Sequence, residues 1–192
     1  GQVLLALPTR INAYDLAKGT IAWTCDGVAH SRGDLGYSSL VLCGDIVFYT
    51  GGFRGPMLAV RTTGKGNVTG DRLFRVEKQP QSIGSGVFVN GYIYRPNAGP
   101  GTIDCIDPKT GEIRWSERAG DAFWASIIMV GEYLYATSQD GRTTVFKPNP
   151  ERLESVATNA LKDRVNATPA AAHGRLYIRG FNALYCVEQP YR

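Results

Sequence analysis

The sequence contains few of the residues that metal and redox sites use. Its 192 residues include four cysteines, two histidines and two methionines. The cysteines Cys25, Cys43, Cys105 and Cys186 are far apart, and none belongs to a Cys-x-x-Cys pair. Structural zinc sites need four Cys or His ligands at short spacings, so such a site is not expected. The even number of cysteines is compatible with a disulfide; the alternative is that all four are free, buried small side chains.

Long apolar runs and clusters of one charge sign are also missing. The longest apolar segments, such as residues 3–7, have the length of a strand. They are far shorter than the ~20 residues of a membrane-spanning helix, so we predict no membrane span. The net charge is +4, from 21 Lys and Arg against 17 Asp and Glu, and the basic residues are scattered. This pattern predicts no nucleic-acid partner.

Glycine and tyrosine, in contrast, are abundant, with 23 and 10 copies. Glycine recurs at the head of short segments that alternate apolar and aromatic residues; the segments are 44–49, 91–94, 131–135 and 174–178. A Gly-led tight turn followed by β-branched and aromatic residues is typical of a hairpin that enters a strand. This abundance of glycine and tyrosine favours many short strands joined by turns.

A second pattern, a small residue followed two positions later by a polar one, recurs every 40 to 46 residues, at 13, 59, 105, 145 and 186. This period is typical of four-stranded propeller blades. We therefore predict an all-β fold of about four β-propeller blades, a partial or half propeller of four-stranded antiparallel units. The window 151–161 is the one segment with ambiguous periodicity, and we predict a strand and a loop there. The predicted units are 1–27, 37–79, 83–119, 124–161 and 166–190.

Two copies of the repeat carry a longer motif. Ala13-x-Asp15-x-x-Lys18-Gly19-x-x-x-Trp23 matches the segment from Cys105 to Trp115 position by position. The Asp carboxylate can cap the following turn, and Gly supplies the positive φ that the turn needs. Trp then points into the layer between neighbouring units.

This motif resembles the tryptophan-docking motif of the pyrroloquinoline quinone (PQQ) repeat family. Its propellers include quinoprotein alcohol dehydrogenases and the outer-membrane assembly lipoprotein. The family usually closes seven or eight blades, so the resemblance implies a C-terminal portion of a longer propeller, or a half-propeller that pairs with another chain as a homo-oligomer. It also implies export to the periplasm or cell surface. A Cys25–Cys43 disulfide between successive units would support export.

A quinoprotein site would require adjacent cysteines, a calcium shell of Glu and Asn, a catalytic Asp and a Trp stacked on the quinone. The sequence has no Cys-Cys pair, and Asp15 and Asp107 have structural roles in their turns. We therefore predict a non-catalytic scaffold without a cofactor, which binds a protein or another ligand. The alternative is a fragment of a PQQ-dependent alcohol or sugar dehydrogenase, with PQQ and calcium held outside this chain. A third hypothesis is a sugar- or polymer-binding propeller.

Asp121 and Trp124 are the candidate ligand contacts. They lie in a connection between two units, where propeller loops can approach the central channel; the alternative is a turn and a packing aromatic. His30, Ser31 and Asp34 are close in sequence, but sequence proximity does not create the geometry of a catalytic triad. No catalytic or metal-binding residue is therefore predicted.

Overall fold

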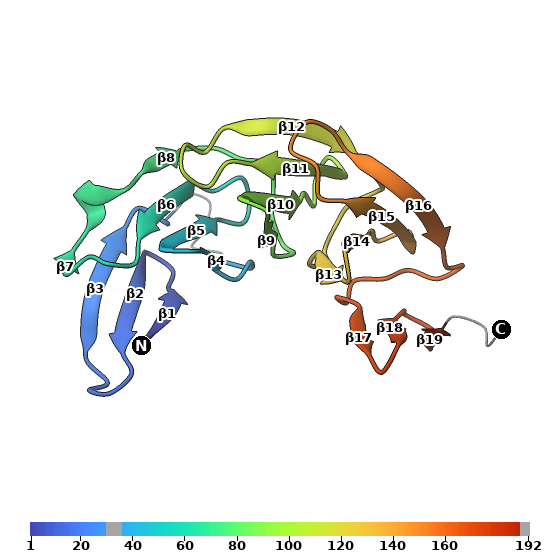
Figure 1. The fold of residues 1–192 in the computed structure, drawn as a ribbon, viewed down its shortest axis with the longest axis horizontal. Coiled ribbons are helices and arrows are strands. Elements are labelled where there is room, and N and C mark those ends of the chain that lie inside the picture. Colours follow the sequence, from blue (N-terminus) through green and yellow to red (C-terminus); the bar gives the residue numbers. More distant parts are fainter. Residues whose placement is uncertain (30–35, 189–192) are drawn as a thin grey trace.

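The computed structural model describes residues 1–29 and 36–188. The described chain is all-β, and its one helical segment is a short 3-10 turn, η1 (Thr69–Asp71). Five sheets follow one another along an arc, with the first and last sheets at its opposite ends (Figure 1). The all-β prediction and the partial propeller are confirmed.

Each sheet is called a blade below and is numbered along the chain. The blades contain β1 (Gln2–Ala6), β2 (Arg10–Asp15) and β3 (Ile21–Asp26); β4 (Val41–Cys43), β5 (Ile46–Thr50), β6 (Met57–Arg61) and β8 (Phe74–Val76); β9 (Val87–Val89), β10 (Tyr92–Pro96), β11 (Thr102–Ile106) and β12 (Ile113–Arg118); β13 (Ile128–Val130), β14 (Tyr133–Thr137), β15 (Arg142–Lys147) and β16 (Glu154–Ala160); and β17 (Ala170–Ala172), β18 (Arg175–Arg179) and β19 (Leu184–Glu188).

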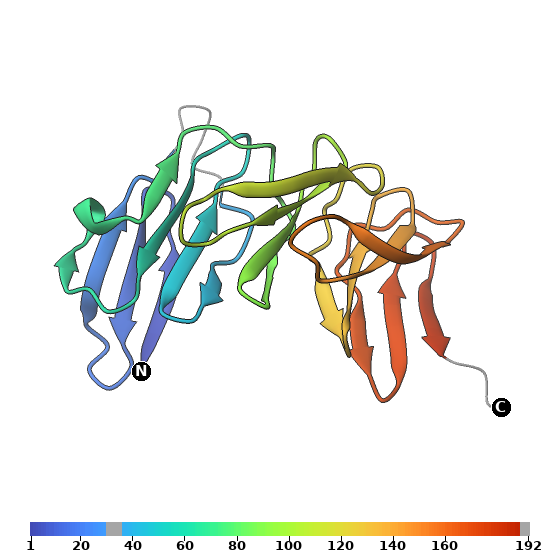
Figure 2. The ribbon, with the colours of Figure 1, turned by 45° about the horizontal axis from the view of Figure 1, so that its top comes forward.

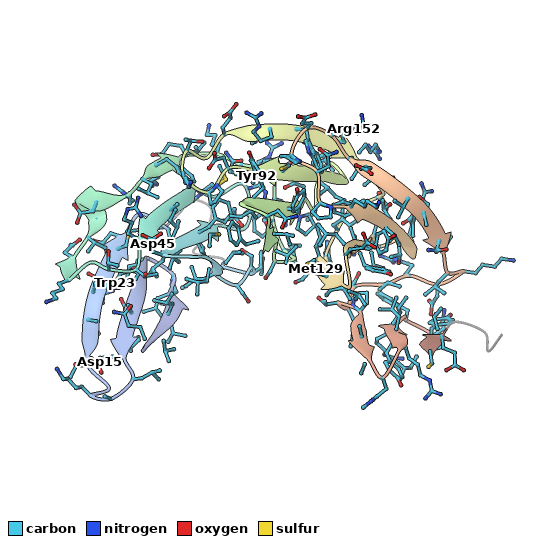
Figure 3. The ribbon with its side chains drawn as sticks, in the orientation of Figure 1. Asp15, Trp23, Asp45, Tyr92, Met129 and Arg152 are labelled. Atoms are coloured by element: carbon cyan, nitrogen blue, oxygen red, sulfur yellow. The ribbon has the colours of Figure 1, made fainter. Side chains whose placement is uncertain are left out.

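Within each blade, successive strands pair antiparallel in a meander. The strands β4, β9, β13 and β17 line the concave side of the arc, while β8, β12 and β16 lie on its convex side (Figure 1). Figure 3 accordingly places Met129 of β13 on the concave side and Arg152 on the convex side. The ambiguous window 151–161 contains β16, so the strand predicted there is confirmed.

The turns of the long motif are built as the sequence predicts. Asp15 Oδ1 accepts hydrogen bonds from the backbone amides of Ala17 and Lys18, at 2.8 and 3.1 Å. Asp107 Oδ1 accepts one from Lys109 at 2.8 Å. Gly19 and Gly111 end these turns with φ of +67° and +77°, values that favour glycine. The carboxylates therefore serve the backbone of their own hairpins (Asp15 is labelled in Figure 3).

The motif tryptophans join each blade to the next one. Trp23 Nε1 donates to the carbonyl oxygen of Thr62 in the second blade at 3.1 Å. Trp115 Nε1 donates to the carbonyl oxygen of Asn149 in the fourth blade at 2.9 Å. Both side chains are buried. Each indole thus fills the layer between two blades and satisfies its one donor on the neighbouring turn.

Strand register shows which residues replace tryptophan in the other blades. The pairs Ala13–Trp23 and Cys105–Trp115 are matched by Ala59–Phe74 in the second blade and by Val145–Ala157 in the fourth. Phe74 packs against Gly111 of the third blade. A Cβ on Gly111 would lie 2.6 Å from a ring carbon of Phe74, so only glycine fits there. Ala157 is exposed and fills no layer. Aromatic wedges therefore separate the first four blades only.

Three apolar clusters fill the spaces between consecutive blades. The first lies between the first and second blades, the second between the second and third, and the third between the third and fourth. No such cluster joins the fourth and fifth blades in the described part of the chain. A cavity of about 680 Å³ lies there instead, lined by β18 and the end of β16 among others.

A series of hydroxyl groups also connects the blades, and we call it the hydroxyl ladder. The backbone amide of Ser39 donates to Ser85 Oγ at 2.8 Å. The amide of Ser85 donates to Ser126 Oγ at 2.9 Å, and that of Ser126 to Thr168 Oγ1 at 3.0 Å. Each residue precedes the innermost strand of its blade. From the second blade to the fifth, one hydroxyl per junction therefore sets the position of each blade against the next.

Two features were not expected from the sequence. The segment after β6 contains β7 (Gly66–Asn67), which reaches back and pairs parallel with β3 of the first blade. The Cys25–Cys43 disulfide does not form, since all four cysteines are free. Cys25 packs in the cluster between the first and second blades, and Cys43 in the cluster between the second and third. Their side chains occupy different layers, which explains why the hypothesis was wrong.

Candidate functional site

The loops at one end of the blades form a continuous surface, which we call the loop face. It consists of loops between the second and third strands of a blade (51–56, 97–101, 138–141, 180–183) and of connections between blades (36–40, 77–86, 119–127, 161–169). Figure 2 shows these connections at the upper end of the blades, while the turns β2–β3 and β17–β18 lie at the lower end.

Backbone hydrogen bonds fix the loop face from blade to blade. The amide of Ala98 donates to the carbonyl of Gln81 at 2.7 Å, and the amide of Gln139 to that of Ala122 at 2.8 Å. Phe123 donates to Asn97 at 3.3 Å. The loops 97–101 and 138–141 are thus each held by the connections on both sides, so their outward-pointing side chains are carried on a positioned backbone.

Asp121 and Trp124, the predicted ligand contacts, both lie on the loop face, in the connection between the third and fourth blades. Both are exposed, Trp124 by 43%. Phe123, between them, and Ala125, after Trp124, are buried and anchor the segment. No described residue makes a side-chain hydrogen bond or ring contact with either. Their part in ligand binding therefore stays a prediction.

Trp124 belongs to a set of exposed aromatic side chains that the sequence analysis missed. Among the described aromatic residues, four are exposed, and all four lie on the loop face: Tyr37, Phe53, Trp124 and Phe181. Tyr37 and Phe53 contact each other, with ring centroids 6.2 Å apart. The guanidinium of Arg164 lies 5.1 Å from the ring centre of Phe181. Because these residues are up to 144 positions apart, only the meander topology brings them to one surface.

The sequence analysis also missed a buried ion pair beneath the loop face. Arg95 of β10 and Asp104 of β11 are each 1% exposed and are joined Nη2 to Oδ2 at 2.5 Å. Ser116 donates to Asp104 Oδ1 at 2.6 Å. The signal was present in the sequence, since a single charged residue interrupts each of two apolar strands.

A cofactor site of the quinoprotein type does not fit the residues at hand. In the described ranges, no three His, Cys, Asp or Glu side chains converge as a metal site would require. The four cysteines lie in four different blades, so no adjacent pair can form. His30, Ser31 and Asp34 lie outside the described residues. No step is therefore derived through PQQ or calcium.

The repeat architecture and the docked tryptophans agree with a profile match over residues 8–190, to the PQQ_2 family described as outer membrane protein assembly factor BamB. The chain belongs to this family. No curated protein sequence matches it. None of the helical segments that the structure describes is long and apolar enough to cross a membrane.

Solved structures with the same fold include BamB from Moraxella catarrhalis, at 15% identity and a TM-score of 0.69, covering 97% of this chain and 57% of that one. The computationally designed Ika8 protein matches at 12% identity and a TM-score of 0.74, covering 98% of this chain and 55% of that one. The designed Ika4 protein matches at 14% identity and a TM-score of 0.60, covering 79% of this chain and 89% of that one. The chain thus spans a little over half the length of the first two.

Proposed function

We propose that the chain is a non-catalytic part of a BamB-like propeller that binds a protein partner through the loop face. The observation that carries this proposal is the gathering of all four exposed aromatic side chains of the described chain on that face. Aromatic residues are enriched in protein interfaces and supply much of their binding energy. Large exposed apolar side chains on a positioned surface favour a binding site.

The proposal includes the missing part of the propeller as a second partner. The first and last blades expose apolar side chains at both ends of the arc, among them Val3, Leu5, Leu184 and Val187. The comparison with longer propellers supports completion by further blades, from a longer chain or from another copy. The name of the family supports a location in the periplasm at the outer membrane.

Photo-crosslinking tests the binding surface. A p-benzoylphenylalanine at position 124 or 181 should give adducts with a partner protein in cells. The matched controls carry it at 16, in the turn between β2 and β3, or at 113, the first residue of β12; both are exposed apolar positions at the opposite end of the blades. Adducts only from positions 16 and 113 would contradict the proposal.

A binding assay tests the absence of a quinone cofactor. The longest native chain that contains these residues is incubated with PQQ and calcium and dialysed, and its absorbance spectrum is recorded. We expect no retained quinone. Stoichiometric retention would establish the dehydrogenase alternative in place of the scaffold.

A further inference from the structure

A cavity of about 840 Å³ opens on the loop face between the second and third blades. One wall is Phe53 and Arg54, in the loop between β5 and β6. The connection from Lys78 to Gln81 forms the second wall, and Gly99 and Pro100 of the third blade form the third. The cavity is therefore assembled from three separate loops.

The charged residues that line this cavity are both basic. Arg54 and Lys78 line it, and no Asp or Glu does. Neither has an ion-pair partner among the residues that the structure describes. Glu77, which precedes Lys78 in the sequence, pairs with Arg75, and Asp104 pairs with Arg95. Two cations without partners in a concave site attract an anionic group.

The inner side of the cavity is held in place by the buried ion pair. Gln79, which lines the cavity, is 9% exposed. Its Oε1 accepts a hydrogen bond from Arg95 Nη2 at 3.3 Å, and its Nε2 donates to the Lys78 carbonyl at 2.7 Å. Arg95 Nε is buried and has no hydrogen-bond partner. A fixed amide backed by a buried guanidinium adds a polar, preorganised element to the site.

The loop that carries Arg54 is held in a sparsely populated backbone conformation. Phe53 and Arg54 are consecutive non-glycine residues with φ of +46° and +64°. Gly51 and Gly55 make this tight loop feasible, because a Cβ on Gly51 would stand 3.2 Å from the Gly55 Cα. Strained residues of this kind cluster at ligand-binding sites. The exposed Phe53 ring, whose centroid lies 6.2 Å from that of Tyr37, lines the same cavity as Arg54.

We infer that this basic cavity binds a carboxylate that lies next to an apolar or aromatic group. Arg54 and Lys78 recognise the carboxylate, and the Phe53–Tyr37 pair contacts the adjacent apolar or aromatic group of the ligand. The inference rests on the proposed scaffold function and names the chemistry of its partner. A carboxylate suits the site because it needs few donors, whereas phosphate sites commonly use helix N-termini or clusters of arginines. The source is an acidic segment of a partner protein or a free polycarboxylate.

Fluorescence anisotropy with defined peptides tests the inference on the full chain. The probe is a fluorescein-labelled peptide Glu-Phe-Glu-Phe-Glu, and its counterpart has Gln in place of each Glu. The test variant combines Arg54→Gln with Lys78→Gln. The control combines Lys65→Gln with Lys109→Gln, which removes the same charge from exposed turns of the same two blades at the opposite end. Citrate is titrated as a competitor.

We expect the Glu peptide to bind, the Gln peptide to bind at least tenfold more weakly, and the test variant to lose about tenfold in affinity while the control is unchanged. Citrate that displaces the peptide below millimolar concentration identifies a free polycarboxylate; citrate without effect identifies the acidic segment. No binding of the Glu peptide, or equal losses in both variants, overturns the inference. Neither result affects the quinone assay or the crosslinks from position 181, so the scaffold proposal is judged separately.

Discussion

At the scale of single residues, the Arg95–Asp104 pair should be a sensitive point of stability. Asp104→Asn leaves the Arg95 charge buried without a counter-ion, since both side chains are 1% exposed. We expect a loss of about 3–5 kcal/mol in the free energy of unfolding, measured by urea denaturation. The control is Asp45→Asn, whose partner Arg61 is half exposed, with an expected loss below ~1 kcal/mol. Equal losses in both variants would contradict the assigned role.

The thiols should differ sharply in reactivity. Cys25, Cys43 and Cys105 are buried, whereas Cys186 is exposed. Burial raises the pKa of Cys25 to about 11, of Cys43 to about 12 and of Cys105 to about 11. At pH 8, Ellman's reagent should therefore modify one thiol of the native chain and four after denaturation. Cys186→Ser should abolish the reaction of the native chain. Two or more reactive thiols in the native chain would show that the reagent reaches the apolar layers between the blades.

The same burial makes stability depend on pH in the alkaline range. A thiol with a raised pKa binds its proton more tightly in the folded state than in the unfolded state, where the value is 9.0. Its stabilising contribution is complete below pH 9 and is lost as the pH rises from 9 towards 12. We expect the urea midpoint to fall over this window, and less steeply in Cys43→Ala. An identical slope in that variant would assign the effect to other groups.

At the same scale, local chemistry was predictable and pairing across strands was not. Asp15 and Asp107 could be assigned to turns because their hydrogen-bond partners lie two or three residues away. The partner of Arg95 depends on the register of β10 against β11, which the sequence pattern leaves undetermined. The cysteine hypothesis failed for the same reason, since adjacency of units does not place two side chains in one layer.

At the scale of the elements, the aromatic wedges should hold neighbouring blades together. Trp115 is buried between the third and fourth blades and donates to Asn149. Trp115→Ala should cost about 3–5 kcal/mol of unfolding free energy, from lost burial and a residual cavity. Trp124→Ala serves as the matched control because that side chain is 43% exposed, and it should change stability by less than ~0.5 kcal/mol. Urea unfolding measures the loss of stability in both variants. A loss in Trp115→Ala as small as that in Trp124→Ala would show that backbone contacts, not the indole, hold the two blades together.

Strand content could be predicted because a Gly-led turn and an alternating segment after it recur in four of the five units. The second and fourth units, which lack the long motif, show where that reasoning ends. Phe74 takes the place of tryptophan although its spacing from the small residue differs from that in the long motif, and register alone reveals it. The pairing of β7 with β3 involves two residues without any apolar pattern. The unit boundaries stay predictions.

At the scale of the whole molecule, period and resemblance predicted a partial propeller, and the arc confirms it. Of the residues on the loop face, the sequence analysis singled out only Asp121 and Trp124. Tyr37, Phe53 and Phe181 belong to different repeats, so no local pattern connects them. Their common surface follows from the meander, which returns every second connection to the same end of the blades.

The fifth blade should open more readily than the others. No apolar cluster of the described chain joins it to the fourth blade, the wedge position there is Ala157, and β17 is exposed along its whole length. Hydrogen bonds such as Phe181 to Arg164 at 3.0 Å and Ser126 to Thr168 at 3.0 Å hold it instead. Segments with few buried apolar contacts open locally at a lower free energy than the core.

Hydrogen exchange followed by mass spectrometry measures this difference. Amides of β18 should exchange roughly 10 to 100 times faster than those of β10 and β14, the corresponding strands of the third and fourth blades, because an opening free energy lower by about 1.4–2.7 kcal/mol produces that ratio. Thr168→Val removes the last acceptor of the hydroxyl ladder and should accelerate β18 further while leaving β10 unchanged. Equal protection of β18 and β10 would show that hydrogen bonds alone integrate the fifth blade into the arc.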